Sequence, residues 1–203
     1  MTTRLGILGG TFDPPHYGHL ALAENGRAQL GLARVLLVPA GQQPLKLGRG
    51  ITPAHHRCSL VEAAIADNPA LTLSRVDLDR PGPHYTTDTL ALLQKAHPDA
   101  SLFFLVGSDS LAQLPAWHDA AGIVQRARLG VMRRPGWEVD LATLEQAVPG
   151  IGQRLDWLDT PCLDIAASDL RRRARQGLPL RYLVPPQVEA YIRKHRLYTG
   201  DSE

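Results

Sequence analysis

The chain has 203 residues, of which 44% are hydrophobic and 21% are charged, and its formal net charge is +2. These values suit one soluble α/β domain with enough interior for a core, and the near balance of charge gives no basis for a nucleic-acid binder. No apolar stretch reaches the roughly 20 residues that a membrane span needs. A signal peptide is not expected, because the first strand begins almost at Met1. Two distant cysteines without a C-x-x-C pair predict reduced thiols and a cytoplasmic protein.

The first predicted elements are a strand, a turn and a helix. Residues 5–8 are apolar, with the length of a buried strand. Gly9 and Gly10 end this strand, and the prolines after Asp13 exclude a helix at that point. A helix-compatible pattern follows from residue 18 to residue 30. This order of elements directs the free N–H groups and the positive dipole end of the helix toward a phosphate site.

Two histidines distinguish this turn. His16 and His19 lie at the start of the helix, and an imidazole donates to phosphate oxygens in either protonation state. One alternative is a plain strand–helix turn with two surface histidines, and a zinc site lacks an obvious third ligand nearby. The G-x-G-x-x-G and G-K-[ST] patterns are absent. The turn therefore predicts a phosphate site of another kind.

Strands and helices alternate through the rest of the chain, without repeats or linkers. The apolar runs predict further strands over residues 35–39, 71–76, 101–106, 129–132 and 155–158. Helices are expected over 53–66, up to 95, up to 126, over 141–147, after 168 and from 185. Polar side chains at their starts predict N-caps at Thr52, at Thr86 or Thr87, and at Ser168. The alternation predicts one doubly wound parallel sheet, spanning residues 1–203 as a single domain.

Three loop residues are candidates for substrate contact. Lys46 lies in the polar loop 40–51, where contact with substrate and a solvated charge are about equally favoured. Asp109 follows the most apolar strand, at the edge where parallel sheets bind ligands, and binds a ribose or caps the next turn. Trp117 belongs to the core or stacks on a planar ring.

A second group of candidates lies in residues 165–175. Arg171 stands where a capping box would place Glu or Gln, so cations lie near the positive end of the helix dipole. This placement is unfavourable by a few tenths of a kcal/mol up to about 1 kcal/mol per charge. A bound polyanion explains it, with the Ser168 hydroxyl and the Arg171 guanidinium converging on phosphate. Arg172, Arg175 or both belong to a solvated face.

Several motifs resemble those of a known family. G-G-T-F-D-P-P-H-Y-G-H resembles the H-x-G-H signature of the nucleotidyltransferase superfamily, relatives of class I aminoacyl-tRNA synthetases. I-A-A-S-D-L-R resembles its second signature, I-S-x-[ST]-x-x-R, with Ala166 replacing the first serine. H-Y-T-T-D-T-L, with His84 for serine, G-S-D-S-L-A-Q-L-P-A-W-H and R-R-P-G resemble the nicotinate-nucleotide adenylyltransferase branch. The resemblance covers nearly the whole chain and implies a Rossmann-like nucleotidyltransferase fold with a small C-terminal helical portion.

The resemblance also implies an activity. It is the transfer of the adenylyl group of ATP to nicotinate mononucleotide, giving nicotinate adenine dinucleotide and pyrophosphate in NAD biosynthesis. Mg²⁺ would be carried on the ATP phosphates, without a metal site on the protein, and the partners would include neither nucleic acid nor membrane. The catalytic residues would be His16, His19 and Arg171. ATP would contact Gly9, Gly10, Thr11, Phe12, His16, His19, Gly107, Asp109, Ser168 and Arg171. Nicotinate mononucleotide would contact Lys46, Thr86, Asp109, Trp117 and Arg134.

Three other functions compete with this interpretation. Pantetheine-phosphate adenylyltransferases share the H-x-G-H loop, but they are shorter and lack the Y-T-x-x-T-L and tryptophan segments. A tRNA synthetase fragment would need a K-M-S-K-S-like loop and an anticodon-binding part. A nucleotide sensor without turnover would not need both histidines and Arg171 intact. The sequence gives no oligomeric state.

Overall fold

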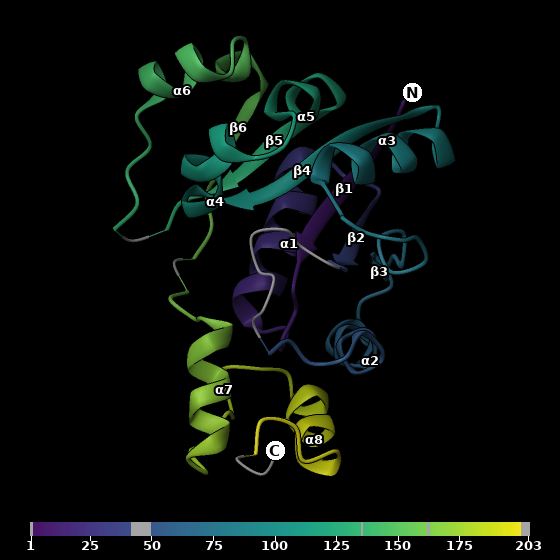
Figure 1. Ribbon diagram of the computed structural model, residues 1–203, viewed down its shortest axis with the longest axis vertical. Helices are drawn as coiled ribbons and strands as arrows, with labels where there is room; N and C mark the ends of the chain where they lie inside the picture. Colours follow the sequence, from purple (N-terminus) through teal and green to yellow (C-terminus); the bar gives the residue numbers. More distant parts are fainter. Residues whose placement is uncertain (1, 42–49, 135, 162, 200–203) are drawn as a thin grey trace.

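The computed structural model describes residues 2–41, 50–134, 136–161 and 163–199, and within them six strands form one parallel sheet (Figure 1). The order across the sheet is β3-β2-β1-β4-β5-β6, and every neighbouring pair is parallel. The chain reverses its direction of winding between β1 and β4, where α/β proteins bind ligands beyond the carboxyl ends of the strands. The predicted doubly wound sheet is confirmed. The strands are β1 (Thr3–Gly10), β2 (Arg34–Pro39), β3 (Leu71–Leu73), β4 (Ala100–Gly107), β5 (Ala127–Met132) and β6 (Leu155–Leu158).

Helices cover both faces of the sheet. The face with α1 (Tyr17–Leu30) and α2 (Ala54–Ile65) buries alternate strand residues such as Leu37 and Leu105. The opposite face buries Leu36 and Phe104 under the remaining sheet helices. Side chains of a strand alternate between faces, so the short apolar runs supply both cores. The helices of the second face are α3 (Thr86–Ala96), α4 (Ser108–Gln113), α5 (Ala120–Arg126) and α6 (Leu141–Ala147), with the short helices η2 (Leu114–Ala116) and η3 (Ile151–Arg154).

Two further helices lie beyond the sheet, at the bottom of Figure 1: α7 (Ala167–Arg175) and α8 (Pro186–Lys194). Leu170 of α7 and Val188 of α8 are buried in the same apolar cluster as Leu60 of α2. This is the small C-terminal helical portion that the family resemblance implied. It extends the α2 side of the molecule past the carboxyl end of β1.

The third strand is shorter than predicted. It ends at Leu73, whereas the alternating pattern predicted a strand up to Val76. The backbone turns after Leu73, because the N–H groups of Leu78 and Asp79 both donate to the carbonyl of Arg75, at 2.8 and 3.0 Å. A turn at this point removes the ladder that a longer strand would need.

The predicted N-caps are wrong at three helices. The capping residues are Pro53 for α2, Tyr85 for α3 and Ala166 for α7, and none of them makes a side-chain cap hydrogen bond. The predicted caps are placed otherwise: Thr52 precedes the α2 cap, Thr86 and Thr87 are the first residues of α3, and Ser168 lies in the first turn of α7. The side chains of these N-caps give no oxygen to the first-turn N–H groups of α3 and α7, although the Asp88 N–H donates to the backbone carbonyl of Tyr85 at 3.1 Å. The other N–H groups at these helix starts suit an anionic ligand.

Candidate active site

The loop between β1 and α1, residues 11–16, brings the two histidines together at the carboxyl end of β1. His16 is the N-cap of α1, and its backbone N–H donates to Nδ1 of His19 at 3.3 Å. The two ring centroids are 3.8 Å apart. His16 is buried, at 2% exposure, while His19 is half-buried. The two rings are tilted by 36° to each other, and His19 is the more exposed member of the pair.

The contacts of His19 fix its tautomer. Because Nδ1 accepts a hydrogen bond, the proton of the neutral ring is on Nε2. The ring of Phe12 meets His19 edge-on, with centroids 5.0 Å apart. Phe12 is itself buried, with a φ of 50°, so any contact that it makes with a nucleotide comes from its backbone.

The electrostatic environment of His16 is unfavourable for a charge. Burial, and then the nearby charge of Arg134, lower the pKa of His16 to about 4. His16 is therefore neutral at pH 7 in the unliganded protein, and its Nδ1 has no hydrogen-bond partner among the described residues. Without phosphates, burial and Arg134 keep this pKa low.

This pKa predicts a pH-dependent stability. The histidine of the unfolded chain takes up its proton near pH 6.5, whereas folded His16 takes it up only near pH 4. As the pH falls through this window, the unfolded state gains a proton that the folded state does not, so the free energy of unfolding decreases. At pH 4.5 the resulting decrease in the free energy of unfolding is about 2 to 3 kcal/mol.

The variant His16→Asn, which keeps a favourable N-cap residue, is expected to lose this part of the acid sensitivity. Urea unfolding at pH 7.5 and pH 4.5 measures it. Equal decreases of the free energy of unfolding in the wild type and the variant would contradict the assigned pKa.

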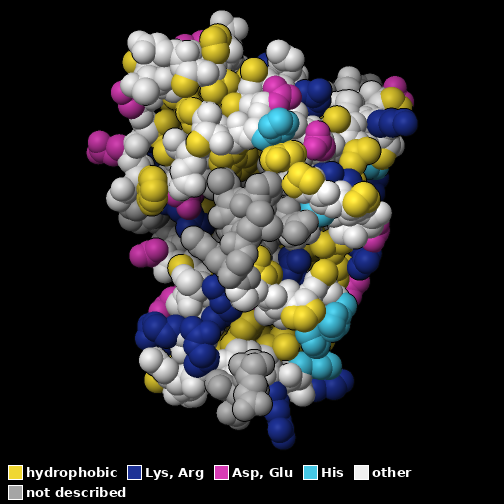
Figure 2. All heavy atoms as spheres, viewed as in Figure 1, with side chains coloured by type: hydrophobic (Ala, Val, Ile, Leu, Met, Phe, Trp, Pro, Cys, Tyr) yellow, Lys and Arg dark blue, Asp and Glu magenta, His cyan; other side chains and the backbone are white. Residues whose placement is uncertain are grey.

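Arg171 joins the second signature to the β1–α1 loop. Its Nη1 donates to the backbone carbonyl of Asp13 at 2.7 Å, across 158 residues of sequence. Ser168 is exposed on the first turn of the same helix. Lys and Arg side chains gather over α7 at the lower left of Figure 2. Arg172 is exposed and pairs with Asp169, as expected for the solvated face.

Asp109 and Arg134 meet at the carboxyl ends of β4 and β5. Oδ1 of Asp109 lies 3.5 Å from Nε of Arg134, and the Arg134 backbone N–H donates to Oγ of Ser108 at 2.9 Å. A Cβ on Gly107 would crowd Oδ1 of Asp109 and lie 2.9 Å from the same Nε, so any larger residue would displace these two side chains. The N-cap of α4 is Gly107, so Asp109 does not cap the helix. Because the charge of Arg134 also lowers the pKa of His16, the Asp109–Arg134 pair and His16 share one electrostatic environment.

A small pocket of about 70 Å³ lies at the carboxyl end of β1. It brings together Thr86 at the start of α3 and Trp117 after η2, next to Gly9 and Gly10 at the end of β1. Trp117 is half-buried and meets Phe104 edge-on at 6.2 Å, so it contacts the core and lines the pocket at once. The remaining lining residues are Ile7, Val38, Ala40, Asp77, His84, Thr89, Leu90 and Phe104.

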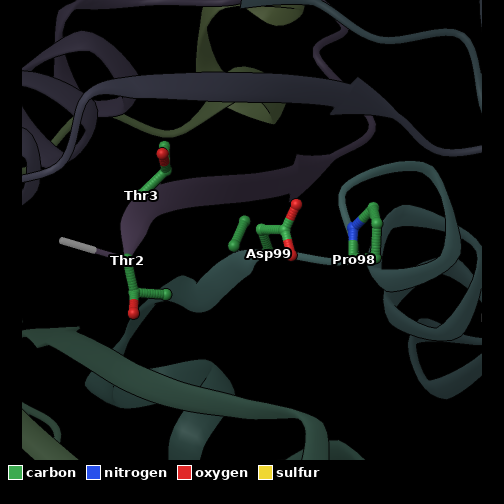
Figure 3. Close-up of a pocket in the computed structure, with 5 residues that line it drawn as sticks. Thr2, Thr3, Pro98 and Asp99 are labelled. Carbon is green, nitrogen blue, oxygen red and sulfur yellow. The ribbon is translucent and has the colours of Figure 1, made fainter.

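A larger hollow of about 450 Å³ lies elsewhere (Figure 3). It is lined by Thr2, Thr3, Pro98, Asp99 and Ala100. These residues lie at the amino ends of β1 and β4, the edge of the sheet opposite to the histidines. None of the predicted site residues lines it, so it is not the candidate site.

Other predicted features are placed as follows. Lys46 lies outside the described residues. Within the ranges that the structure describes, no three His, Cys, Asp or Glu side chains are grouped to hold a metal ion. No described helix has both the length and the apolar character to cross a membrane.

The sequence did not reveal the buried residues whose hydrogen bonds hold the β1–α1 loop in place. Arg57 of α2, at 3% exposure, donates to the carbonyls of Thr11, Ala40 and Thr52 at 2.9 to 3.0 Å. Asp13, at 2% exposure, accepts from the backbone N–H of Thr52 at 3.2 Å. An arginine on the apolar face of residues 54–65 was a usable signal for Arg57, because an arginine is rarely buried unless it is paired.

Comparisons with known proteins give the family. Residues 7–173 match the family model described as cytidylyltransferase-like. A protein of Thermomicrobium roseum, described as a probable nicotinate-nucleotide adenylyltransferase, is 51% identical over 196 residues, covering 97% of this chain and 92% of that protein. A Roseiflexus protein of the same description is 48% identical, covering 96% and 97%. The structure of Plasmodium falciparum nicotinic acid mononucleotide adenylyltransferase complexed with NaAD shares the fold, with a TM-score of 0.80, 19% identity and 97% of each chain covered. The chain therefore belongs to the nicotinate-nucleotide adenylyltransferases of the cytidylyltransferase-like family.

Proposed function

We propose that this chain joins nicotinate mononucleotide to the adenylyl group of ATP, giving nicotinate adenine dinucleotide and pyrophosphate, at the carboxyl edge of its sheet. The observation that carries the proposal is the hydrogen bond from Arg171 to the carbonyl of Asp13. This bond unites the two segments that bear the phosphate donors. The relatives' names support the substrate class, and the pocket lined by Thr86, Trp117, Gly9 and Gly10 supports our assignment of the pyridine ring to it.

The reaction needs charge neutralisation more than a base. The nucleophile is an anionic phosphate, and the barrier comes from bringing it to the anionic triphosphate. We assign His19, through its Nε2 proton, and His16 to oxygens of the α- and β-phosphates. Ser168 and Arg171 are assigned to the departing pyrophosphate. The neutral His16 donates a hydrogen bond without bringing a full charge into a buried position.

The remaining residues bind the two nucleosides. We assign Asp109 to ribose hydroxyls, with Gly107 leaving room for it, and Arg134 to the mononucleotide phosphate. Gly9, Gly10, Thr11 and Phe12 supply backbone contacts to ATP. The reaction uses a divalent metal with ATP, and we propose Mg²⁺, which prefers phosphate oxygens and keeps several waters. ATP therefore enters as its magnesium complex.

We also propose that residues 1–203 work as a single nucleotidyltransferase domain in the cytoplasm, with ATP and nicotinate mononucleotide as its partners. The contact from α7 to the β1–α1 loop supports a single unit, because one site draws on both ends of the chain. The pair of distant cysteines without a C-x-x-C motif supports the location. We propose no nucleic-acid or membrane partner.

Release of pyrophosphate tests the proposal. The purified protein should release it only when ATP, Mg²⁺ and nicotinate mononucleotide are all present. A sensor would bind ATP without releasing pyrophosphate. Release that depends on pantetheine phosphate instead of nicotinate mononucleotide would contradict the proposed acceptor.

Nicotinate mononucleotide is expected to be preferred over the nicotinamide form. A carboxylate only accepts hydrogen bonds, and Thr86 offers its hydroxyl and the first-turn N–H groups of α3, whereas an amide also needs an acceptor. Thr86→Val should therefore reduce the ratio of kcat/KM for nicotinate mononucleotide to kcat/KM for the nicotinamide form. Trp117→Ala should weaken the binding of both mononucleotides alike. Ring stacking is worth roughly 0.5 to 1.5 kcal/mol and does not distinguish the acid from the amide.

The control is Trp137→Ala, since Trp137 is exposed and does not line the pocket. It should leave both kcat/KM values unchanged. Equal kcat/KM for the two mononucleotides in the wild type, or a preference for the nicotinamide form, would contradict this prediction. It would show that hydrogen-bond donors in the pocket do not select the substrate.

A further inference from the structure

The last described segment of the chain returns to the β1–α1 loop. The hydroxyl of Tyr198 donates to Oδ1 of Asp13 at 2.7 Å, across 185 residues of sequence. The other carboxylate oxygen, Oδ2, accepts from the N–H of Thr52 at 3.2 Å. Each oxygen of this buried carboxylate therefore has its own donor, and one of the two donors comes from the C-terminal segment.

The position of Tyr198 is set by the docking of α8 on α2. Val188 and Ile192 of α8 are buried in the cluster that contains Leu60 of α2. The hydroxyl of Tyr191 lies 3.0 Å from Nδ1 of His56 and adds a polar contact between the two helices. Histidine side chains gather on this side of the molecule, at the lower right of Figure 2. The segment after α8 thus leaves from a fixed base.

Both ends of the Tyr198–Asp13 contact have an unusual backbone. Tyr198 has a φ of 66°, and Phe12, just before Asp13, has a φ of 50°. Bulky side chains rarely adopt this left-handed region, and such conformations persist where the surroundings determine them. Burial and the neighbouring carboxylate raise the pKa of Tyr198, so its phenol remains a donor at neutral pH.

We infer that Tyr198 is a positioning residue, whose hydroxyl fixes the Asp13 carboxylate and thereby the turn that presents His16 and His19 to ATP. The inference rests on the proposed function. Asp13 receives Tyr198 on its side chain and Arg171 on its carbonyl, so one residue links the C-terminal segment, α7 and the histidine loop. Without the hydroxyl, no described residue donates to the buried Oδ1, which lies close to the charge of Arg57, and the loop must shift to satisfy it.

The variant Tyr198→Phe removes one oxygen atom and tests the inference. It is expected to lower kcat by about 10- to 100-fold, because a hydrogen bond to a buried charge is lost and the phosphate donors move with the loop. The Kd of nicotinate mononucleotide, whose proposed pocket is lined by Thr86 and Trp117, should stay within about twofold of the wild type. A purely structural role would lower the thermal midpoint and leave kcat of the folded enzyme unchanged.

Two control variants separate this effect from a general loosening of the C-terminal segment. Tyr191→Phe removes the hydroxyl that contacts His56 and should leave kcat within about twofold. Tyr182→Phe changes a side chain that is 84% exposed and should change nothing. In a double-mutant cycle, Asp13→Ala with Tyr198→Phe should be no slower than Asp13→Ala alone, since alanine offers no acceptor and the hydroxyl acts through the carboxylate.

The outcomes are distinguishable. A wild-type protein that releases no pyrophosphate contradicts the proposed function. An active wild type with an unchanged kcat in Tyr198→Phe, or with the same loss in Tyr191→Phe, overturns the inference alone. If Tyr198→Phe does not fold, Asp13→Ala provides the test, because wild-type kcat in that variant would show that the carboxylate does not position the loop.

Discussion

His19→Ala is expected to lower kcat by about 10²- to 10³-fold, the effect of removing one preorganised donor from a developing charge. His19 is the more exposed of the two histidines, at the first turn of α1, and the His16 backbone N–H holds its Nδ1. Its Nε2 proton is therefore set before ATP binds. Steady-state kinetics with both substrates saturating measures the loss.

The stability of the same variant shows whether the role is chemical. Loss of the half-buried hydrogen bond from the His16 backbone N–H should by itself reduce the free energy of unfolding by only about 0.5 to 1.5 kcal/mol. His55→Ala, at an exposed position on α2, is the matched control and should keep full activity. Near-normal kcat in His19→Ala would contradict the assignment. A large drop in thermal stability would indicate a structural role instead.

Arg171→Ala is expected to reduce kcat/KM for ATP by about 10- to 100-fold, the range for a lost charge-assisted hydrogen bond. Arg172→Ala, one residue further along α7, should change it by less than about twofold, because its exposed pair with Asp169 contributes little. The two variants remove the same charge from the same helix. Equal losses would show that α7 acts as a diffuse positive field and that Arg171 has no specific contact. Arg171→Lys tests the geometry, since lysine keeps the charge without the planar fork.

Much of the fold was predictable because its signals are local. The buried strands β1, β2 and β4 are short apolar runs, and their alternation with helices implies a parallel sheet. The N-caps failed for a physical reason, because Ser and Thr side chains also bind distant partners. Thr87, for example, donates to Asp119 at 2.8 Å instead of capping α3. The strand predicted up to Val76 failed because Arg75 begins a turn.

In the candidate site, too, the features with local signals were predictable and those that depend on long-range contacts were not. His16 and His19 belong to one short motif, so the sequence predicted them together. The contacts of Arg57 and Tyr198 with the loop span 46 and 185 residues, and no local pattern reports such pairings. The low pKa of His16 depends on its burial and on Arg134, which only the folded chain brings near.

The central claim is that adenylyl transfer takes place at the α-phosphorus of ATP. It is tested most directly by incubating the wild-type protein with Mg²⁺, nicotinate mononucleotide and ATP labelled at the α-phosphate. The expected result is that the label enters a dinucleotide, with one unlabelled pyrophosphate released for each dinucleotide formed. Label recovered in free AMP, transfer of the γ-phosphate, or ATP that is bound but unchanged would contradict the claim.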